Sequence, residues 1–229
     1  MTNVFRRTGT TPVVKTPARP DRGAAGHTAH MSVLAVVLAA GGGTRFAGPD
    51  HKLLAELGDA PIVEHAIRAA VEARIGSVVV ITGAVPLDEI VERFERETVT
   101  VATVHNPDWA DGQATSLQRA IAEARDRGVD SIVVGLGDQP FVTADAWRAV
   151  ATADAPIAVA EYDGRRRNPV KLDREVWADL PTSGDEGARG VLRLKPHLVQ
   201  PIPCEGSAAD IDTWEDLQSW QSRSSTNSP

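Results

Sequence analysis

The sequence has one cysteine, Cys204, so the chain cannot form an internal disulfide or a cysteine-based metal cluster. No run of apolar residues approaches the ~20 residues that a membrane-spanning helix requires. The formal net charge is −7, and an acidic protein is poorly suited to bind nucleic acid or an anionic membrane. We therefore expect a cytoplasmic protein with no nucleic-acid or membrane partner.

Two common nucleotide-binding motifs are also missing, although the sequence contains a glycine-rich segment. The residue three positions after Gly43 is Phe46, where the dinucleotide fingerprint has glycine. Gly43 and Gly48 have the spacing of a P-loop, but residues 49–50 are Pro-Asp instead of Lys-Ser or Lys-Thr. No Ser/His/Asp or Cys/His constellation for covalent catalysis stands out. A phosphate site in this chain must therefore be of another kind.

The two ends of the sequence differ from its middle. Residues 1–30 are rich in Thr, Pro, Gly, Ala and Arg and have no hydrophobic period, which predicts a disordered N-terminal extension. Met31 opens the first apolar run, so we expect a folded domain over residues 31–221 and hypothesise that Met31 is the native start. The polar residues 222–229 are expected to form a flexible tail.

Between these ends, strand-like and helix-like segments alternate. The alternation predicts an α/β fold with a three-layer, doubly wound, Rossmann-like and mostly parallel sheet, followed by a short C-terminal α+β portion. The expected strands cover residues 33–39, 77–82, 99–104, 131–136, 157–160, 169–172 and 198–202. The expected helices cover residues 61–74, 86–97, 113–127, 143–151, 187–194 and 213–220. In such sheets ligands bind beyond the carboxyl ends of the strands, so the loops after the first and fourth strands should share one rim.

Three consecutive glycines, residues 41–43, follow the first expected strand. Because they lack side chains, several backbone N–H groups can point at one phosphate. Arg45 and Lys52 add the positive charge that a triphosphate needs. The alternative is a mobile loop without a ligand. His51 is expected to be a surface residue.

This segment resembles the phosphate loop of a nucleotidyltransferase superfamily. The shared pattern is Leu-Ala-Ala-Gly at residues 38–41, then Gly-x-Thr-Arg at 42–45 and Lys-Leu-Leu at 52–54. Ala40 is similar to the cytidine-using branch, the molybdenum cofactor cytidylyltransferases of the MobA-like NTP transferase family, although UTP stays open. The segment between Arg45 and Lys52 is longer than in these relatives, which leaves the place of Lys52 open. The resemblance implies that the nucleotide is held by Leu38, Ala39, Ala40, Gly41, Gly42, Gly43, Thr44, Arg45 and Lys52.

Two later segments resemble the same family. Residues 106–117 resemble its Asn-Pro…Gly…Ser-Leu segment, which implies that Gly112 and Ser116 approach the base and ribose; a loop with a helix cap is the alternative. Within this segment, Trp109 is expected to be buried in the core; the alternative is that its side chain covers a bound ligand. Gly-Asp-Gln-Pro at residues 137–140 resembles the metal-binding turn, which implies that Asp138 holds Mg²⁺, against a cap or turn as the alternative. Gln139 is expected to shape that turn.

The last third of the chain carries three further similarities. Residues 184–189 resemble the Gly-Asp-x-Gly-Ala-Arg element, which implies that the acceptor is bound by Gly184, Asp185, Gly187 and Arg189; the alternative is an N-cap beside a surface arginine. Residues 165–170 resemble a strand entry, but the arginines at 165–167 depart from it and are interpreted as a solvated loop, or as a cluster that gathers an anionic acceptor. Residues 210–217 resemble a segment of the same family, which implies that Asp212 is a second metal ligand. The alternative is that Asp212 only caps the last helix.

The resemblance implies an enzyme that uses Mg²⁺ to transfer CMP from CTP to a phosphate-bearing acceptor, the molybdopterin cofactor, with release of pyrophosphate. Arg45, Lys52 and Asp138 would be the catalytic residues, and a molybdoenzyme or its chaperone would be a protein partner. Within the same class, the acceptor could be a sugar phosphate or methylerythritol phosphate. From other classes, the chain could be an NAD(P)H-dependent reductase or a non-catalytic protein that binds and delivers the cofactor.

Overall fold

The computed structural model describes residues 32–188, 190, 193 and 195–226. The expected extension at residues 1–30, Met31 and parts of the expected helix 187–194 lie outside the described residues. The strands are β1 (Val33–Ala39), β2 (Glu56–Leu57), β3 (Ala60–Pro61), β4 (Ser77–Thr82), β5 (Val101–His105), β6 (Ser131–Leu136), β7 (Ile157–Tyr162), β8 (Arg165–Asp173) and β9 (Val199–Pro203). The helices are α1 (Ile62–Ala73), α2 (Asp88–Glu92), α3 (Gln113–Asp126), α4 (Ala144–Ala151) and α6 (Trp214–Thr226). Short 3-10 helices cover Lys52–Leu54, Trp109–Asp111, Arg174–Asp179 and Pro196–Leu198.

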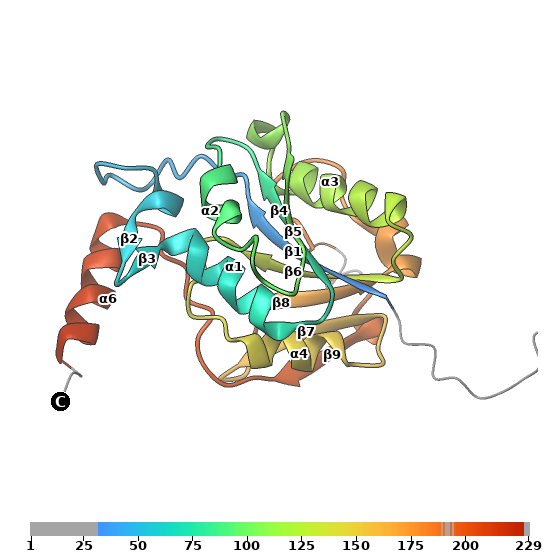
Figure 1. The fold of residues 1–229 in the computed structure, drawn as a ribbon. Coiled ribbons are helices and arrows are strands. Elements are labelled where there is room, and N and C mark those ends of the chain that lie inside the picture. Colours follow the sequence, from blue (N-terminus) through green and yellow to red (C-terminus); the bar gives the residue numbers. More distant parts are fainter. Residues whose placement is uncertain (1–31, 189, 191–192, 194, 227–229) are drawn as a thin grey trace, which may run out of the picture. The chain divides into compact units, whose positions relative to one another are not determined.

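Seven strands form one sheet in the order β5-β4-β1-β6-β8-β7-β9 (Figure 1). β1 pairs in parallel with β4 on one side and with β6 on the other, and β4 pairs in parallel with β5. β8 runs antiparallel to both of its neighbours, β6 and β7, whereas β9 is parallel to β7. The predicted α/β class with a mostly parallel sheet is confirmed.

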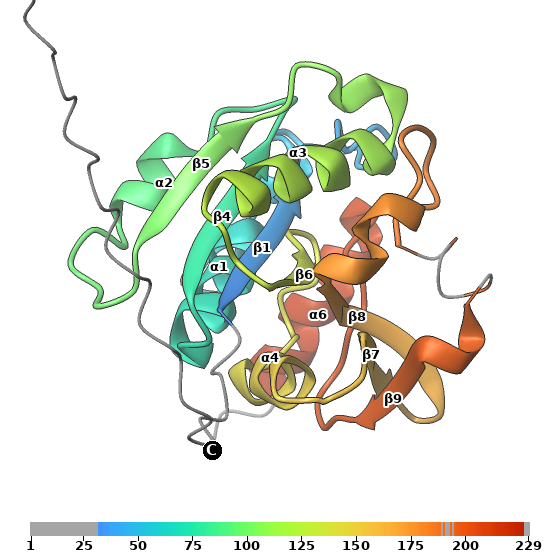
Figure 2. The ribbon, with the colours of Figure 1, turned by 90° about the vertical axis from the view of Figure 1, so that its right-hand side faces the viewer.

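Successive residues of the strands point to opposite sides of the sheet and bury two separate apolar cores. On one side, Ala35 and Val37 of β1 pack with residues of α1 and α4. On the other side, Leu34 and Val36 of β1 pack with residues of α3, among them Leu117. Figure 2 shows α1 and α3 on opposite faces of the sheet. The helices therefore form the two outer layers of the predicted three-layer fold.

The C-terminal helix α6 lies beside the small hairpin of β2 and β3 (Figure 1). A third apolar cluster joins them, in which Ile211 and Leu217 pack with Phe46 and Leu57. This cluster brings the segment that contains Asp212 next to the loop that follows β1.

Residues 165–167 belong to strand β8, which corrects the expectation of a solvated loop before a strand at 169–172. Asp163 and Gly164 both have positive φ, 49° and 73°, as a two-residue hairpin turn requires. This turn continues the pairing of β7 and β8 outward, so that Arg166 lies opposite Glu161. The arginines are thus held on a strand, although their side chains stay exposed.

Two helices differ in length from the prediction. The expected helix 86–97 ends at Glu92, because the following residues form turns with hydrogen bonds over three residues, such as Phe94 N–H to the Val91 carbonyl. The last helix runs to Thr226 and so extends into the segment 222–229 that was expected to be a flexible tail. Among the described residues, no helix combines the length and apolar character that crossing a lipid bilayer requires.

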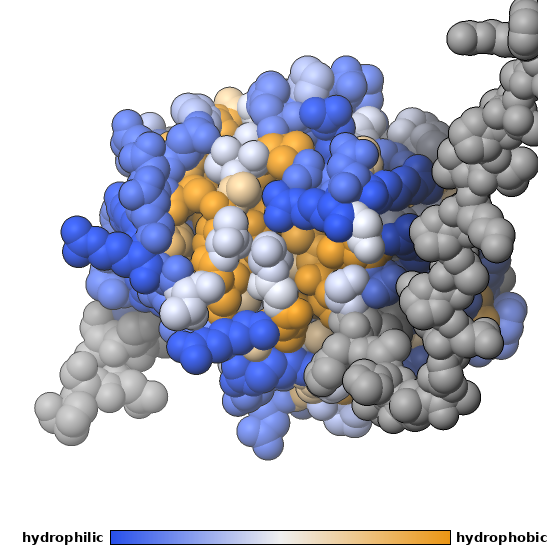
Figure 3. Space-filling view, turned by 45° about the vertical axis from the view of Figure 1, so that its right-hand side comes forward, coloured by the Kyte–Doolittle hydropathy of each residue, from blue (hydrophilic) through white to orange (hydrophobic). Residues whose placement is uncertain are grey.

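The edge strand β5 is only partly covered. Among the described strands it has no partner on its outer side, and residues 101–104 are half-buried. Figure 3 shows one face of the molecule, on which hydrophobic residues reach the surface between hydrophilic ones.

Candidate active site

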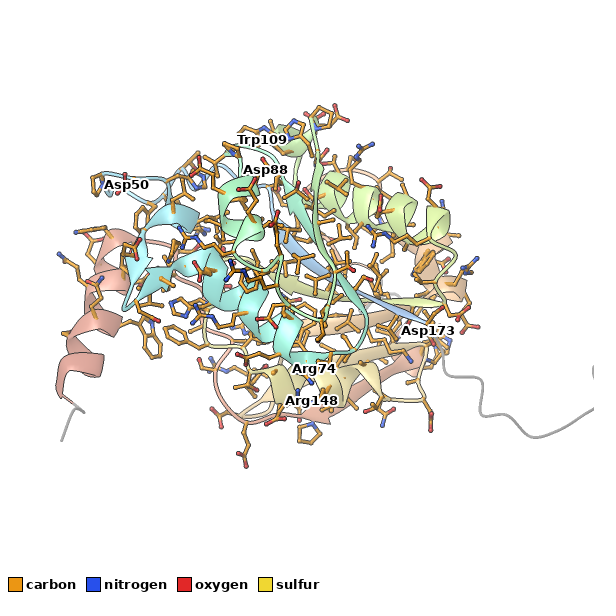
Figure 4. All side chains as sticks on the ribbon, viewed as in Figure 1. Asp50, Arg74, Asp88, Trp109, Arg148 and Asp173 are labelled. Atoms are coloured by element: carbon orange, nitrogen blue, oxygen red, sulfur yellow. The ribbon has the colours of Figure 1, made fainter. Side chains whose placement is uncertain are left out.

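The carboxyl ends of β1 and β6 lie side by side, because Leu38 pairs with Leu136. The chain order reverses here, since β4 lies on one side of β1 and β6 on the other. Crevices at such reversals are the usual ligand sites of open α/β sheets. A pocket of about 330 Å³ opens at this point. Figure 4 shows Trp109, a residue of the pocket wall, at this rim, and Asp173 far from it.

Many of the residues predicted to bind nucleotide line this nucleotide pocket. They are Leu38, Ala40, Gly41, Gly42, Thr44, Gly112 and Ser116, together with the metal candidate Asp138. Ala39 does not belong to this group, because its side chain is buried in the core on the α1 side of the sheet. Only the backbone of Ala39 is therefore available to a nucleotide.

The glycine loop is bounded closely on one side and open on the other. A Cβ atom at Gly42 would lie 2.9 Å from Cζ3 of Trp109, so the indole ring packs directly on the loop backbone. Trp109 was expected in the core, and the structure instead places it in the pocket wall. Gly43 has φ of 60°, a conformation that favours glycine. No atom lies within 4 Å of the Cβ position of Gly41, which therefore faces open space.

Two cations and two carboxylates meet next to this loop. Lys52 Nζ lies 2.6 Å from Asp138 Oδ2 and 3.2 Å from Asp212 Oδ1. Arg45 binds Asp212 with both of its terminal nitrogens, each at 3.1 Å. The side chain of Lys52 is 10% exposed, whereas that of Arg45 is 74% exposed. Lys52 is thus held in place by buried contacts, whereas the ion pair of Arg45 with Asp212 is open to solvent.

The ammonium group of Lys52 is stabilised in its charged form. Burial by itself lowers the pKa of Lys52, but the charge and hydrogen bond of Asp138, together with those of Asp212, outweigh it, so the pKa is raised. The long segment before Lys52 does not move it away from the site. Instead, His51 caps the 3-10 helix at Lys52–Leu54, because its Nδ1 accepts a hydrogen bond from the Leu53 N–H at 3.3 Å.

His51 was expected to be a surface residue, and it is instead half-buried behind the loop. Burial lowers the pKa of His51, and the nearby charge of Lys52 acts in the same direction. The imidazole is therefore neutral at pH 7, which allows its Nδ1 to accept the hydrogen bond that orients Lys52.

The two carboxylates have the chemistry that a magnesium ion requires. Oδ1 of Asp138 is buried and accepts no hydrogen bond from any described residue. The described residues include no group of three or more His, Cys, Asp or Glu side chains that could hold a metal by themselves. Mg²⁺ is commonly bound by one or two carboxylates plus substrate phosphates and water, so Asp138 and Asp212 fit this ion when a triphosphate is present.

The loop after β5 is tied to the segment at residue 184. Asn106 is fully buried and donates to Ser116 Oγ at 3.0 Å, which fixes this hydroxyl at the pocket wall. Gly112 has φ of 107°, and a Cβ atom there would lie 2.5 Å from the carbonyl carbon of Gly184. Backbone hydrogen bonds join the same segments, from Ala114 N–H to the Gly184 carbonyl at 2.9 Å.

The residues predicted to bind the acceptor are divided between two adjoining pockets. Asp185 lines the nucleotide pocket, and Gly184 packs against Gly112. Gly187 instead lines a second, small cavity of about 60 Å³, which shares Leu38, Gln113 and Leu136 with the first. Arg189 lies outside the described residues.

Comparison with known proteins agrees with this geometry. The sequence profile of the MobA-like NTP transferase domain matches residues 35–201. The chain belongs to this family. As a family member it is a nucleotidyltransferase-type enzyme, as the sequence predicted.

Three relatives of this MobA-like protein are informative. Nicotine blue oxidoreductase of Paenarthrobacter nicotinovorans is 30% identical over 84% of this chain and 98% of its own length. The 3-deoxy-manno-octulosonate cytidylyltransferase of Alteromonas mediterranea is 32% identical, over 55% of this chain and 48% of its own length. The crystal structure of Rv0371C from Mycobacterium tuberculosis in complex with manganese has a TM-score of 0.65 and 25% identity, and covers 84% of this chain and 98% of that one.

Proposed function

We propose that the enzyme transfers CMP from CTP to a phosphate group of molybdopterin, in the cytoplasm, with release of pyrophosphate. The observation that carries this proposal is the cluster of Lys52, Asp138, Asp212 and Arg45 beside an open glycine loop at the switch point of the sheet. Such a cluster suits a reaction whose main demand is charge neutralisation on phosphates. Ala40 and the relative that is a cytidylyltransferase both favour CTP.

The reaction requires no general base. An acceptor phosphate is already ionised at neutral pH, and one of its oxygens attacks the α-phosphorus of CTP in line. The bond from the α-phosphorus to its bridging oxygen breaks, and pyrophosphate leaves with that oxygen and its electron pair. The protein therefore contributes positioning and electrostatic stabilisation.

Each part of the site has a role in this scheme. Backbone N–H groups of Gly41 and its neighbours bind the phosphates, and Arg45 moves from Asp212 to the triphosphate. Lys52 remains buried and supplies fixed positive charge beside the reacting phosphorus. Asp138 and Asp212 would hold Mg²⁺, which supplies charge neutralisation for the triphosphate when it is bound. The manganese complex of the mycobacterial relative favours a divalent ion of this kind.

A nucleotide panel tests the proposal. Purified protein is mixed with Mg²⁺, molybdopterin and each of CTP, GTP, UTP and ATP, and released pyrophosphate is measured. Release with CTP is expected. Release only with another nucleotide would contradict the assignment of CTP. Release only when a sugar phosphate or methylerythritol phosphate replaces molybdopterin would contradict the assignment of the acceptor.

One observation favours a second candidate, an oxidoreductase. Nicotine blue oxidoreductase matches this chain over almost its entire length. The missing dinucleotide fingerprint and the cation–carboxylate cluster argue for phosphoryl chemistry instead. Oxidation of NADPH with a dye as electron acceptor, without pyrophosphate release in the nucleotide panel, would favour the oxidoreductase. Nucleotide binding without either reaction would favour a carrier that delivers the cofactor.

A further inference from the structure

The link between the two cations of the site is held to the protein at its ends. Residues 46–51 separate Arg45 from Lys52, and most of them are exposed. At the start of the link, however, Phe46 is buried, at 9% exposure. Because His51 caps the helical turn at Lys52, it holds the other end. Phe46 is therefore the residue that can hold the end next to Arg45.

Phe46 packs against the first residue of α6, Trp214. The two ring centroids lie 5.7 Å apart and the ring planes meet at 77°, which is the edge-to-face arrangement that aromatic pairs favour. The backbone of the link contacts the same indole, because a Cβ atom at Gly48 would lie 2.8 Å from Cε3 of Trp214. Trp214 thus contacts the link at two points, where the loop after β1 reaches α6 (Figure 1).

The position of Phe46 determines where the side chain of Arg45 begins. The N–H group of Phe46 donates to the Gly43 carbonyl at 2.9 Å, which closes a tight turn over residues 43–46. Arg45 directly precedes Phe46 in this turn. A displacement of the Phe46 ring would therefore also displace the guanidinium group that we assign to the triphosphate.

The N-terminal end of α6 is itself fixed by a reciprocal cap. Asp216 Oδ2 accepts hydrogen bonds from the N–H groups of Asp212 and Thr213, at 3.1 and 2.9 Å. In return, the Asp216 N–H donates to Thr213 Oγ1 at 3.1 Å. Trp214 lies within this cap, two residues after Asp212. This end of α6 therefore contacts the loop twice, through the ion pair of Asp212 with Arg45 and through the ring of Trp214.

We propose that Trp214 is a positioning residue, which holds Arg45 toward the triphosphate by packing on Phe46. This inference rests on the proposed nucleotidyl transfer, in which Arg45 leaves Asp212 for a phosphate. Once that ion pair is broken, the aromatic contact still joins the loop to α6. Without the aromatic contact, nucleotide binding would have to order a looser loop, and the entropy cost lowers the affinity.

A double-mutant cycle on nucleotide binding tests this role. The Kd of CTP with Mg²⁺ is measured by titration calorimetry, without an acceptor. Arg45→Gln should raise this Kd by about tenfold or more, because it removes a charge-assisted contact to phosphate. Trp214→Leu should raise the Kd by about threefold or more when Arg45 is present, but by less than about 1.5-fold in the Arg45→Gln variant. Equal effects in both backgrounds would mean that the ring does not act through Arg45, and would overturn the inference.

Three further variants separate the contact from general effects on folding. Trp220→Leu is the matched control, because Trp220 also belongs to α6 but packs on Phe141, at 3.9 Å between centroids. Its Kd for CTP should stay within about 1.5-fold of the wild type. Trp214→Phe keeps an aromatic ring and should bring the Kd back to within about twofold of the wild type. Phe46→Leu removes the same contact from the loop side and replaces Trp214→Leu in the cycle if thermal melting shows that Trp214→Leu does not fold.

Limited proteolysis tests the contact without nucleotide. Trypsin cleaves after arginine and Arg45 is exposed, so cleavage between Arg45 and Phe46 reports how often this turn opens. The fragment that begins at Phe46, identified by mass spectrometry, should form at least about threefold faster in Trp214→Leu than in the wild type, and no faster in Trp220→Leu. Equal rates in all three proteins would overturn the inference, even if pyrophosphate is released from CTP.

The same measurements separate this inference from the proposed function. Faster cleavage and a Kd effect that depends on Arg45, without any pyrophosphate release, would confirm Trp214 as a positioning residue for nucleotide binding and refute the proposed transfer. Pyrophosphate release with a Kd that is indifferent to Trp214→Leu and Phe46→Leu would leave the transfer intact and refute the role of Trp214. Absent binding of CTP by the wild type would refute both.

Discussion

Substitution of Lys52 by Met removes the buried cation and keeps the bulk of the side chain. In the wild type, Lys52 Nζ contacts Asp138 at 2.6 Å and Asp212 at 3.2 Å. After the substitution, Asp138 has no cationic partner among the described residues, whereas Asp212 retains Arg45. We expect a less stable protein with a severely impaired site.

The size of both effects follows from the exposure of the partners. Loss of one partner of a fully buried ion pair costs about 3–5 kcal/mol. The side chains of Asp138 and Asp212 keep 22% and 28% exposure, and water screens part of this penalty. We therefore expect a loss of about 1–3 kcal/mol, which lowers the melting temperature of a domain of this size by about 2–4 °C per kcal/mol. Turnover should fall by at least about 10²-fold, because charge stabilisation in the transition state is lost.

Calorimetry and pyrophosphate release measure the two effects. Lys171→Met is the matched control, because Lys171 is also a buried lysine, paired at 3.1 Å with Asp173, which lies far from the site (Figure 4). It should lower stability and leave the KM for CTP unchanged. Added Mg²⁺ should restore part of the stability of Lys52→Met, since two carboxylates there lack their shared cation. Unchanged melting temperature and turnover in Lys52→Met would refute the assigned role.

Three further predictions concern the same site. Arg45→Gln should lower turnover by at least about 10²-fold, measured by pyrophosphate release. The free energy of unfolding, measured by denaturant titration, should change by less than about 1 kcal/mol, because the ion pair of Arg45 is exposed. Gly42→Ala should raise the KM for CTP several-fold, because the new Cβ would lie 2.9 Å from Trp109 and force the indole to shift. An unchanged KM would contradict a role of Trp109 in nucleotide binding. Stability should also fall at alkaline pH. Burial opposes the charged form of Lys52, but Asp138 and Asp212 outweigh it and raise the pKa of Lys52 above the unfolded value of about 10.4. The stability that the charged Lys52 contributes is therefore fully present below that pH and is lost as the pH rises through the folded pKa. Denaturant titrations from pH 9 to 11.5 should show a steeper loss for the wild type than for Lys52→Met.

Local patterns in the sequence were enough to predict the scaffold. The strands Ser77–Thr82 and Ser131–Leu136 have the bounds expected from their apolar runs. The helix expected over residues 143–151 has almost these bounds, and Thr143 caps it, because Thr143 Oγ1 accepts a hydrogen bond from the Ala146 N–H at 3.2 Å. These features depend on neighbouring residues, which a sequence displays directly.

The parts that could not be predicted depend on contacts between distant residues. The resemblance placed Lys52, Asp138 and Asp212 in one site, but it did not predict the ion pairs that join Lys52 to Asp138 and Asp212, 86 and 160 positions away. The hydrogen bond from Gln139 Nε2 to Asp210 Oδ1 likewise joins residues that are 71 positions apart. The start of β8 is different, because the Asp163-Gly164 dipeptide is a local hairpin signal that could have predicted it.

The central claim is that this site transfers a nucleotidyl group. The most direct test is a single-turnover reaction of the wild type with CTP labelled at the α-phosphate, Mg²⁺ and molybdopterin, with Asp138→Asn as the parallel variant. The account predicts that the label appears in a molybdopterin product as pyrophosphate is released, and that Asp138→Asn forms at least about 10²-fold less product per unit time. Label that remains entirely in CTP, while the wild type oxidises NADPH with a dye acceptor, would contradict it.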